Sequence, residues 1–135
     1  MPKSNLYIGV LSGTSADSID ALLVDFSNSI KVIDRFSEKI PKKVKDNIFE
    51  LVLNKKLPNY TEKQKELDCK LGKLIGKCVN QLIKKSQVDK QTVKGIGSHG
   101  QTIIHSSSRK KPFSLQIGNP ELIKKLTGIK VVHGF

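Results

Sequence analysis

The sequence predicts an α/β fold in which helices pack against a mixed sheet. Strand-like apolar segments occur at both ends of the chain, segments with helical periodicity lie between them, and most connections are short. The 135 residues amount to at most one ordinary domain and are enough to bury a core. No internal repeat, low-complexity tract or linker divides the sequence.

The N-terminal region is expected to form three strands. Apolar runs cover residues 6–11, 19–26 and 30–40, and short connections cover 12–18 and 27–29. Such connections favour an antiparallel meander. The first run, Leu6–Leu11, has no polar face, so we expect a central strand that is covered on both sides. Pro41 should end the strand region.

Two helical segments should follow. The first is Lys42–Asn54, and Leu57-Pro58-Asn59 should break it. Thr61 and Gln64 have the spacing of a capping box, which predicts the start of a longer helix that fades near Ser86. Its apolar stripe recurs about every 3.6 residues and comprises Leu67, Leu71, Leu74, Ile75, Cys78, Leu82 and Ile83.

Small residues and thiols in the long helix allow two further predictions. Gly72 and Gly76 lie four residues apart, which indicates close packing against another element. Cys69 and Cys78 are too far apart along one helix to form a disulfide, and neither has a neighbour at metal-binding spacing. We therefore expect both cysteines to be reduced and structural.

The C-terminal region should return to strands around one short helix. The predicted strands are residues 93–98, 101–105, 113–117 and 129–132, with a polar turn at 106–111. Asn119 is the expected N-cap of the helix, and Pro120 should occupy its first position. The helix should run through Leu126 and stop at Gly128.

The composition is strongly basic, with a net charge of +12 from 24 basic and 12 acidic residues. This charge is compatible with a lysine-rich module that binds nucleic acid or another polyanion, which is the alternative function. However, Arg35 and Arg109 are the only arginines, and no basic cluster alternates with aromatic residues. We therefore expect the lysines between Lys39 and Lys94 to form a solvated surface, without a nucleic-acid partner.

The sequence also bears on location. No apolar run approaches the roughly 20 residues that a membrane span needs, and the first residues lack the apolar segment of a signal peptide. We therefore expect no membrane partner and a cytoplasmic location.

The connection between the first two strands has the chemistry of a phosphate site. Its tip, Ser12-Gly13-Thr14-Ser15, is small and hydroxylated, and Asp17 and Asp20 follow just beyond. Backbone N–H groups and hydroxyls without bulky side chains allow a phosphate to approach closely. Nearby carboxylates suit a phosphate-bound Mg²⁺. The sequence therefore predicts a phosphate-binding hairpin.

A second glycine-rich segment has a different character. Residues 95–100 satisfy G-x-G-x-x-G, but β-branched residues follow where a dinucleotide site needs a helix, and no acid appears until Glu121. His99 and Gln101 should lie at a strand end, where they either face a cleft or belong to a hydrogen-bonded turn.

Three motifs stand in order along the chain. The first is Ile8-Gly9-Val10-Leu11-Ser12-Gly13-Thr14-Ser15 with Asp17 and Asp20, the second is Gly97-Ser98-His99-Gly100-Gln101-Thr102, and the third is Leu115-Gln116-Ile117-Gly118-Asn119-Pro120 with Leu122-Ile123 and Thr127-Gly128-Ile129. Together they resemble the anhydro-N-acetylmuramic acid kinase family. That family belongs to the sugar-kinase, Hsp70 and actin superfamily, whose two RNase-H-like domains enclose ATP.

The resemblance implies a function and roles for residues. The family phosphorylates 1,6-anhydro-N-acetylmuramic acid with ATP, opening the anhydro ring with water, during recycling of bacterial cell-wall fragments. His99, Gly100 and Gln101 would line the cleft toward the amino sugar, and Asp17 and Asp20 would orient Mg²⁺. The ATP-binding hairpin would comprise Gly13, Thr14, Ser15, Ala16, Asp17, Ser18, Ile19 and Asp20.

The chain also departs from the family pattern. Ser18 stands in place of a usual Gly, which would require a strained backbone there, Ala16 replaces a larger apolar residue and Asn119 replaces Asp. Gly134 takes the place of the Asp in an Asp-Phe-Arg stretch. The family's catalytic aspartate and its adenosine-binding domain would lie beyond Phe135.

We therefore expect residues 1–135 to be the N-terminal phosphate-binding domain of a two-domain kinase, truncated to the first RNase-H-like domain of the actin and hexokinase type, with the second domain absent. Such a chain should be inactive alone. Its partner would be a second copy in a homodimer or a separately encoded C-terminal half. A non-functional truncated gene product is the remaining alternative.

Overall fold

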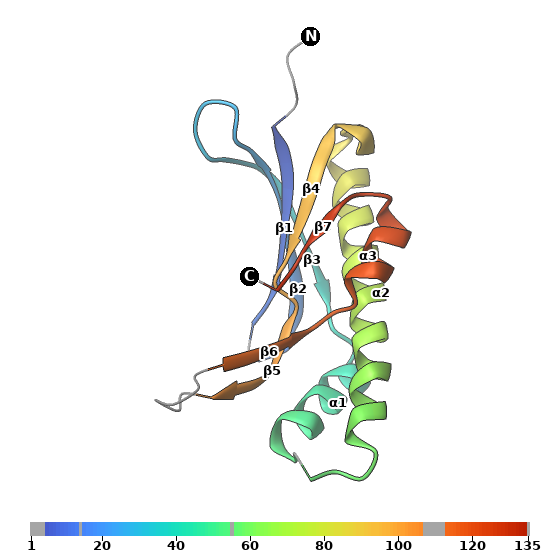
Figure 1. Ribbon diagram of the computed structural model, residues 1–135. Coiled ribbons are helices and arrows are strands. Elements are labelled where there is room, and N and C mark those ends of the chain that lie inside the picture. Colours follow the sequence, from blue (N-terminus) through green and yellow to red (C-terminus); the bar gives the residue numbers. More distant parts are fainter. Residues whose placement is uncertain (1–4, 14, 55, 107–112, 135) are drawn as a thin grey trace.

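The computed structural model describes residues 5–13, 15–54, 56–106 and 113–134, without the side chains of residues 104–106 and 113–115. The predicted turn at 106–111 lies almost wholly outside these residues. Figure 1 shows a long sheet with helices along one side and a small two-stranded unit at one end. The elements are β1 (Leu6–Ser12), β2 (Ser18–Asp25), β3 (Lys31–Lys39), α1 (Lys42–Leu53), α2 (Tyr60–Ser86), η1 (Lys90–Thr92), β4 (Val93–Ser98), β5 (Gln101–Ser106), β6 (Phe113–Ile117), α3 (Pro120–Thr127) and β7 (Val131–Val132).

The main sheet of the described chain has the strand order β3-β2-β1-β4-β7. The first three strands form the predicted antiparallel meander, whereas β4 pairs parallel with both β1 and β7. The predicted α/β class with a mixed sheet is therefore confirmed. The arrangement is that of a ribonuclease H-like domain of the actin and sugar-kinase type.

The strands β5 and β6 form a separate antiparallel pair. They project from the end of the main sheet at which β1 passes into β2. The G-x-G-x-x-G segment lies in β4 and the turn into β5, with no helix after it. The prediction that this segment is not a dinucleotide-binding motif is confirmed.

The core lies between the sheet and α2. Ile8 and Val10 of β1 and Leu23 of β2 are at most 2% exposed. They face buried residues of α2, among them Leu71, Ile75, Val79 and Leu82. Burial of each such side chain contributes roughly 1.5–3 kcal/mol. This packing fixes the ends of the strands relative to the helices.

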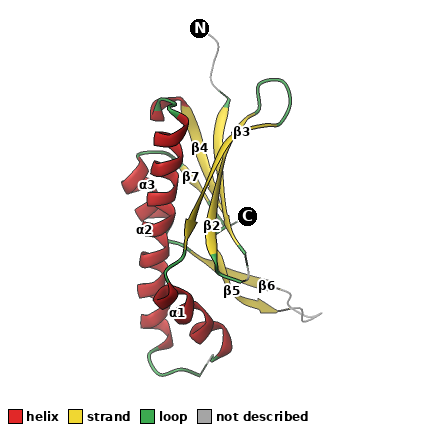
Figure 2. Cartoon of the chain, turned by 180° about the vertical axis from the view of Figure 1, so that it is seen from behind, coloured by secondary structure: helices red, strands yellow, loops and turns green. Residues whose placement is uncertain are grey.

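The helices of the described chain cover one face of the sheet (Figure 2). On the other face of β1, Tyr7 and Leu11 are 39% and 51% exposed. The expectation that this strand is covered on both sides is therefore wrong for the described residues. The outward positions of β1 carry an aromatic residue, a glycine and a leucine, so the strand has no polar face in its sequence. This pattern does not require a second layer of helices on that face of the sheet.

The beginning of α2 also differs from the prediction. The helix starts at Tyr60, and its N-cap Asn59 has a left-handed backbone with no side-chain hydrogen bond to the helix. The predicted capping box of Thr61 and Gln64 is therefore wrong, because both residues lie inside the first turns. By contrast, the side chain of Asn119 caps α3 as predicted, and Gly128 ends that helix with φ +72°.

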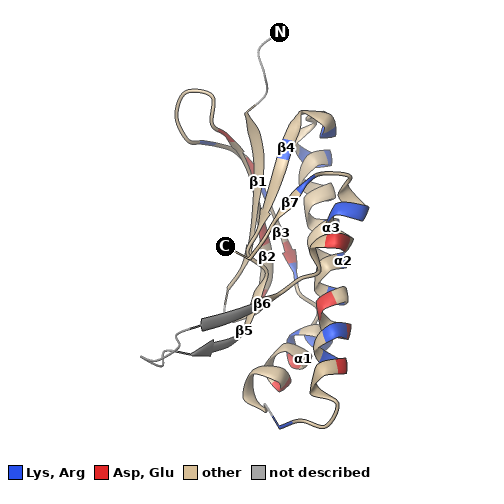
Figure 3. Cartoon of the chain, viewed as in Figure 1, with Lys and Arg blue, Asp and Glu red and all other residues tan. Residues whose placement is uncertain are grey.

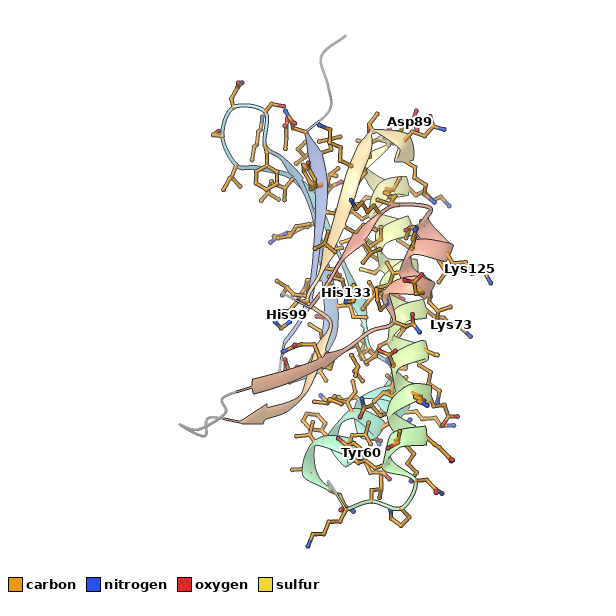
Figure 4. All side chains as sticks on the ribbon, in the orientation of Figure 1. Tyr60, Lys73, Asp89, His99, Lys125 and His133 are labelled. Atoms are coloured by element: carbon orange, nitrogen blue, oxygen red, sulfur yellow. The ribbon has the colours of Figure 1, made fainter. Side chains whose placement is uncertain are left out.

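The charged residues lie mainly on the outer surfaces. In Figure 3, Lys and Arg are spread along the outer side of the helices, and Lys73 and Lys125 extend outward in Figure 4. Of the lysines with described side chains, all except Lys45 and Lys70 are exposed. Both cysteines are free, Cys69 exposed and Cys78 buried. Among the described residues, no helix is both long enough and apolar enough to cross a membrane.

Candidate functional site

The hairpin between β1 and β2 is a short, tightly turned segment. The N–H of Ala16 donates to the carbonyl of Gly13 at 3.0 Å. Gly13 and Ser15 are exposed at the tip, whereas the Ala16 side chain is fully buried. Thr14, which was predicted to donate to phosphate, lies outside the described residues. The described part of the tip thus presents small groups to solvent, as a phosphate site requires.

The strained position of the hairpin is Ala16. Its φ is +54°, a left-handed value that a residue with a Cβ adopts at a cost of about 1–2 kcal/mol. Ser18 instead begins β2 and pairs with Lys39 of β3. The expectation of strain at Ser18 is therefore wrong. The substitution of Gly by Ser is accommodated because the chain is already extended at that point.

Gln101 connects the hairpin to the turn between β4 and β5. Its Nε2 donates to the carbonyl of Gly13 at 3.2 Å, and its Oε1 accepts a hydrogen bond from the hydroxyl of Ser12. The residue is 2% exposed. The N–H of His99 also donates to the carbonyl of Val10 at 3.0 Å, which holds the same turn against β1. Gln101 therefore orders the hairpin, and its side chain is occupied by these contacts.

Asp17 lies on the side of the hairpin that faces α1. Its carboxylate accepts a hydrogen bond from Lys45 Nζ at 2.5 Å, and its carbonyl accepts one from the N–H of Ile40 at 2.9 Å. The hydrogen bond from Lys45, followed by that from Ser15, lowers the pKa of the Asp17 carboxyl below its usual 3.8. The group is ionised at neutral pH, and a lysine already neutralises its charge.

Asp20 has different surroundings. It lies on β2 opposite Leu11 of β1 and Ser37 of β3, and its carboxylate accepts a hydrogen bond from the Ser37 hydroxyl. Asp20, Arg35 and Ser37 line a shallow depression of about 270 Å³. The two predicted metal-orienting carboxylates thus have partners on different elements, α1 for Asp17 and β3 for Asp20.

The donor set suits a metal that arrives with phosphate. The described residues contain no group of three His, Cys, Asp or Glu side chains that could hold a metal ion by themselves. Mg²⁺ commonly binds proteins through one or two carboxylates together with water and substrate phosphates. Asp20, with Asp17 nearby in sequence, fits this mode because the protein need supply only part of the coordination shell.

A cavity of about 350 Å³ lies beside the turn between β4 and β5. His99 and His133, which are labelled in Figure 4, both line the cavity. Gly100 also lines it and has φ +75°, and a Cβ there would lie 2.4 Å from the carbonyl oxygen of Ile117. Of the three residues predicted to face the substrate, His99 and Gly100 lie at the cavity, whereas the Gln101 side chain bonds to the hairpin.

Asp68 of α2 supports one wall of this cavity. Its Oδ1 accepts a hydrogen bond from the N–H of Gly118 at 2.7 Å, and its carbonyl accepts one from the N–H of Asn119 at 3.0 Å. These bonds fix the start of α3 against α2. Sequence reasoning missed Asp68 because it stands beside the apolar stripe of a helix and belongs to none of the three motifs.

The hydroxyl of Ser98 is a further polar group at the cavity. Ser98 is 4% exposed, and its Oγ has no hydrogen-bond partner within the described part of the chain. Buried hydroxyls nearly always have a partner, so this group needs one from water or a bound molecule. The wall therefore combines a hydroxyl, imidazole rings, an amide and a carboxylate, which suits a polar ligand with many hydroxyls.

Comparison with known proteins gives consistent matches. A protein-family model described as anhydro-N-acetylmuramic acid kinase matches residues 5–135. An anhydro-N-acetylmuramic acid kinase of Coxiella burnetii (strain RSA 493) is 43% identical over 135 residues, which are 100% of this chain and 35% of the relative.

Kinases of the same name from two Shewanella species are also similar. The protein of Shewanella sediminis is 43% identical over 136 residues, and that of Shewanella loihica is 40% identical over 134 residues. Each alignment covers 98% of this chain and 36% of the relative. The chain therefore spans about a third of the length of these curated relatives.

Proposed function

The chain belongs to the anhydro-N-acetylmuramic acid kinase family, and on this premise we propose that it is the N-terminal, phosphate-binding part of an enzyme that phosphorylates 1,6-anhydro-N-acetylmuramic acid with ATP. Water opens the anhydro ring while the terminal phosphate of ATP passes to the sugar, which yields the 6-phosphate and ADP. The reaction serves the recycling of cell-wall fragments. The hairpin, with its small exposed tip ordered by Gln101, is the observation that carries this proposal.

The role of the hairpin is to position phosphate. Phosphoryl transfer depends mainly on alignment and on neutralisation of charge. Ser15, through its N–H, and Thr14 would donate to phosphate oxygens, while the Ser15 hydroxyl bonds to Asp17. Asp20 would orient the metal or its water ligands, with Asp17 nearby but paired with Lys45, and Mg²⁺ would supply charge neutralisation when it is bound. Gln101 donates to Gly13 and accepts from Ser12, and these bonds order the described part of the hairpin before the nucleotide arrives.

The cavity beside the β4–β5 turn is the proposed site of the amino sugar. His99 and the buried hydroxyl of Ser98 provide hydrogen-bonding groups to its hydroxyl or amide groups. The cavity and the hairpin share the β4–β5 turn, because Gln101 contacts the hairpin while His99 and Gly100 line the cavity. This arrangement supports the proposal, because a sugar in the cavity would lie near a phosphate at the hairpin.

The proposal extends to the organisation of the family polypeptide. Residues 1–135 form one wall of the nucleotide cleft, and the relatives are nearly three times as long as the matched segment. The catalytic base and the adenosine site belong to the part of those proteins that this chain does not span. A second copy, or a separately encoded second half, is the partner that would complete the cleft.

Titration calorimetry with Mg²⁺·ATP tests the nucleotide site. We expect binding by the wild-type chain and at least about tenfold weaker binding by Asp20→Asn, because a charge-assisted contact is lost. Asp25→Asn is the matched control, since Asp25 lies at the opposite end of β2 and its carboxylate accepts hydrogen bonds from Ser27, away from the hairpin. Binding that falls steeply with salt and is indifferent to Asp20→Asn would instead support polyanion binding.

Binding of the amino sugar is tested in the same way. We expect His99→Ala to weaken the binding of 1,6-anhydro-N-acetylmuramic acid about tenfold and to leave Mg²⁺·ATP binding unchanged, because a single neutral hydrogen bond is lost. Equal sugar affinity in both proteins would contradict the assignment of the cavity.

A coupled assay of ADP release tests turnover. For the 135-residue chain with ATP and the anhydro sugar, we predict a rate no higher than that without enzyme, because the chain supplies only one wall of the proposed cleft. Turnover well above the background would show that residues 1–135 contain all the required groups.

A further inference from the structure

We infer that Lys45 of α1, which lies outside all three motifs, is a positioning residue for the hairpin: it holds Asp17 against α1 and leaves Asp20 as the hairpin carboxylate that is free to meet a metal-bound phosphate. The inference rests on the proposed nucleotide-binding function. It separates the roles of two carboxylates that the sequence alone treats as equivalent.

Two contacts join Asp17 to the beginning of α1. One is the ion pair of its carboxylate with Lys45 Nζ at 2.5 Å, and the other is the hydrogen bond from the N–H of Ile40 to its carbonyl at 2.9 Å. Ile40 is 2% exposed, so its backbone is fixed by the core. The side-chain contact therefore supplements an anchored backbone contact and fixes the direction of the carboxylate.

The exposure of the ion pair argues for positioning over stability. The side chains of Lys45 and Asp17 are 35% and 65% exposed. Ion pairs with this degree of exposure contribute little to the stability of a fold, because solvent screens both charges. They can nevertheless fix the direction of a charged side chain on the surface of a loop.

Helix α1 itself is well anchored, which allows it to serve as a support. Ile48 and Leu51 are 1% and 2% exposed and belong to the core. Lys45 lies three residues before Ile48, and its backbone N–H donates a hydrogen bond to the carbonyl of Pro41. A cation on a rigid helix thus faces a loop that carries an anion.

Asp20 contrasts with Asp17 because no cation among the described residues forms an ion pair with it. Its carboxylate accepts a hydrogen bond from the neutral hydroxyl of Ser37 on β3. Such a bond orients the group without neutralising its negative charge. Asp20 therefore retains the charge that a metal ion requires, whereas Lys45 has already neutralised that of Asp17.

Hydrogen exchange on the full chain tests the positioning role without any nucleotide. We expect the protected amides of Ala16 and Ile40 to exchange about three- to fivefold faster in Lys45→Gln, because the loop opens locally more often. Lys45→Arg should restore exchange to within about twofold of wild type, since it can remake the ion pair. The urea midpoint of Lys45→Gln should stay close to that of wild type.

Lys42→Gln is the matched control. Lys42 lies one turn earlier on α1, and among the described residues its only ion pair is with Asp46, at 91% and 63% side-chain exposure. It should leave exchange at Ala16 and Ile40 unchanged. Unchanged exchange in Lys45→Gln, or an equal acceleration of every amide together with a lower urea midpoint, would overturn the positioning role.

Paramagnetic broadening by Mn²⁺·ATP separates the two carboxylates. In the wild-type chain we expect stronger broadening of the Asp20 signals than of the Asp17 signals, and in Lys45→Gln an increase of at least about twofold at Asp17, because the carboxylate is released. Equal broadening at both residues in wild type would overturn the division of roles. If wild type binds no Mn²⁺·ATP, the proposed function fails, and hydrogen exchange alone decides the role of Lys45.

Discussion

At the scale of single residues, the hairpin depends on a few side chains whose environments are unlike those of their neighbours. Ala16 adopts a left-handed backbone while its methyl group is fully buried. Gln101 satisfies two polar groups of the hairpin from a buried position. These contacts hold the tip in one conformation before a ligand binds.

The backbone at Ala16 leads to a prediction about stability. Ala16→Val should destabilise the chain by roughly 2–4 kcal/mol, because a β-branched residue opposes the left-handed conformation and overfills the site. Ala21→Val is the matched control, since Ala21 is equally buried but lies in the extended strand β2. Urea unfolding should show a larger loss for Ala16→Val. Equal losses would mean that the backbone at Ala16 carries no strain.

The sequence predicted the composition of this site better than its geometry. The small hydroxylated tip and His99 beside a cavity follow from motif and position. The strain at Ala16, in place of Ser18, could not be predicted because it depends on how β2 pairs with β3. Lys45 and Asp68 carry no local signal, since each acts on a segment far away in the sequence.

At the scale of elements, α2 is the support for both α3 and the sheet. Gly72 and Gly76 permit the close approach of α3, as their spacing predicted. A Cβ at Gly72 would lie 2.9 Å from the backbone oxygen of Asn119, whereas one at Gly76 would lie 2.9 Å from the Cδ1 atom of Leu126. The two glycines therefore face neighbours of different rigidity.

This difference predicts unequal effects of alanine. Gly72→Ala should destabilise the chain by about 1–3 kcal/mol, because the backbone of the Asn119 turn must move. Gly76→Ala should cost less, since Leu126 is 44% exposed and can adjust, and alanine favours the helix by up to about 1 kcal/mol. Thermal or urea unfolding of both variants provides the measurement. A larger loss for Gly76→Ala would contradict the packing described here.

The contact between β3 and the end of α2 predicts a dependence on pH. Asp34 accepts a hydrogen bond from Lys85 Nζ at 3.0 Å, and this contact lowers the pKa of the carboxyl below its usual 3.8. A lowered folded-state pKa contributes stability that is present above pH 3.8 and is lost as the pH falls through the folded value.

The lowered pKa of Asp34 determines the expected result. Asp34→Asn should have a lower urea midpoint than wild type near pH 6, and the difference should shrink as the pH falls below 3.8. Asp46→Asn is the control, since its pair with Lys42 is highly exposed. A difference between Asp34→Asn and wild type that stays constant down to pH 2 would exclude this linkage.

Element types were largely predictable because they depend on local periodicity. The apolar run over residues 19–26 and the apolar stripe of the long helix predicted β2 and α2 with nearly correct ends. The start of α2 was less predictable because the left-handed Asn59, which has no side-chain cap, depends on how the preceding loop enters the helix. The separation of β5 and β6 from the main sheet is a tertiary property without a local signature.

At the scale of the whole molecule, the strand order brings the hairpin, the β4–β5 turn and the start of α1 to one end of the sheet. The phosphate-binding and sugar-binding residues of the proposal therefore come from distant parts of the sequence. The helices of the described chain cover one sheet face, and a groove of about 460 Å³ lined by Tyr7, Gly9, Phe26 and Val132 lies on the other.

The central claim is that the hairpin between β1 and β2 binds the phosphates of a nucleotide. Addition of Mg²⁺·ATP to the ¹⁵N-labelled chain tests this claim most directly, because amide shifts report the site residue by residue. We predict that the largest shifts occur at Gly13, Ser15 and Ala16, with small shifts along α2. Shifts confined to the lysine-bearing helices, or no shift at saturating Mg²⁺·ATP, would contradict it.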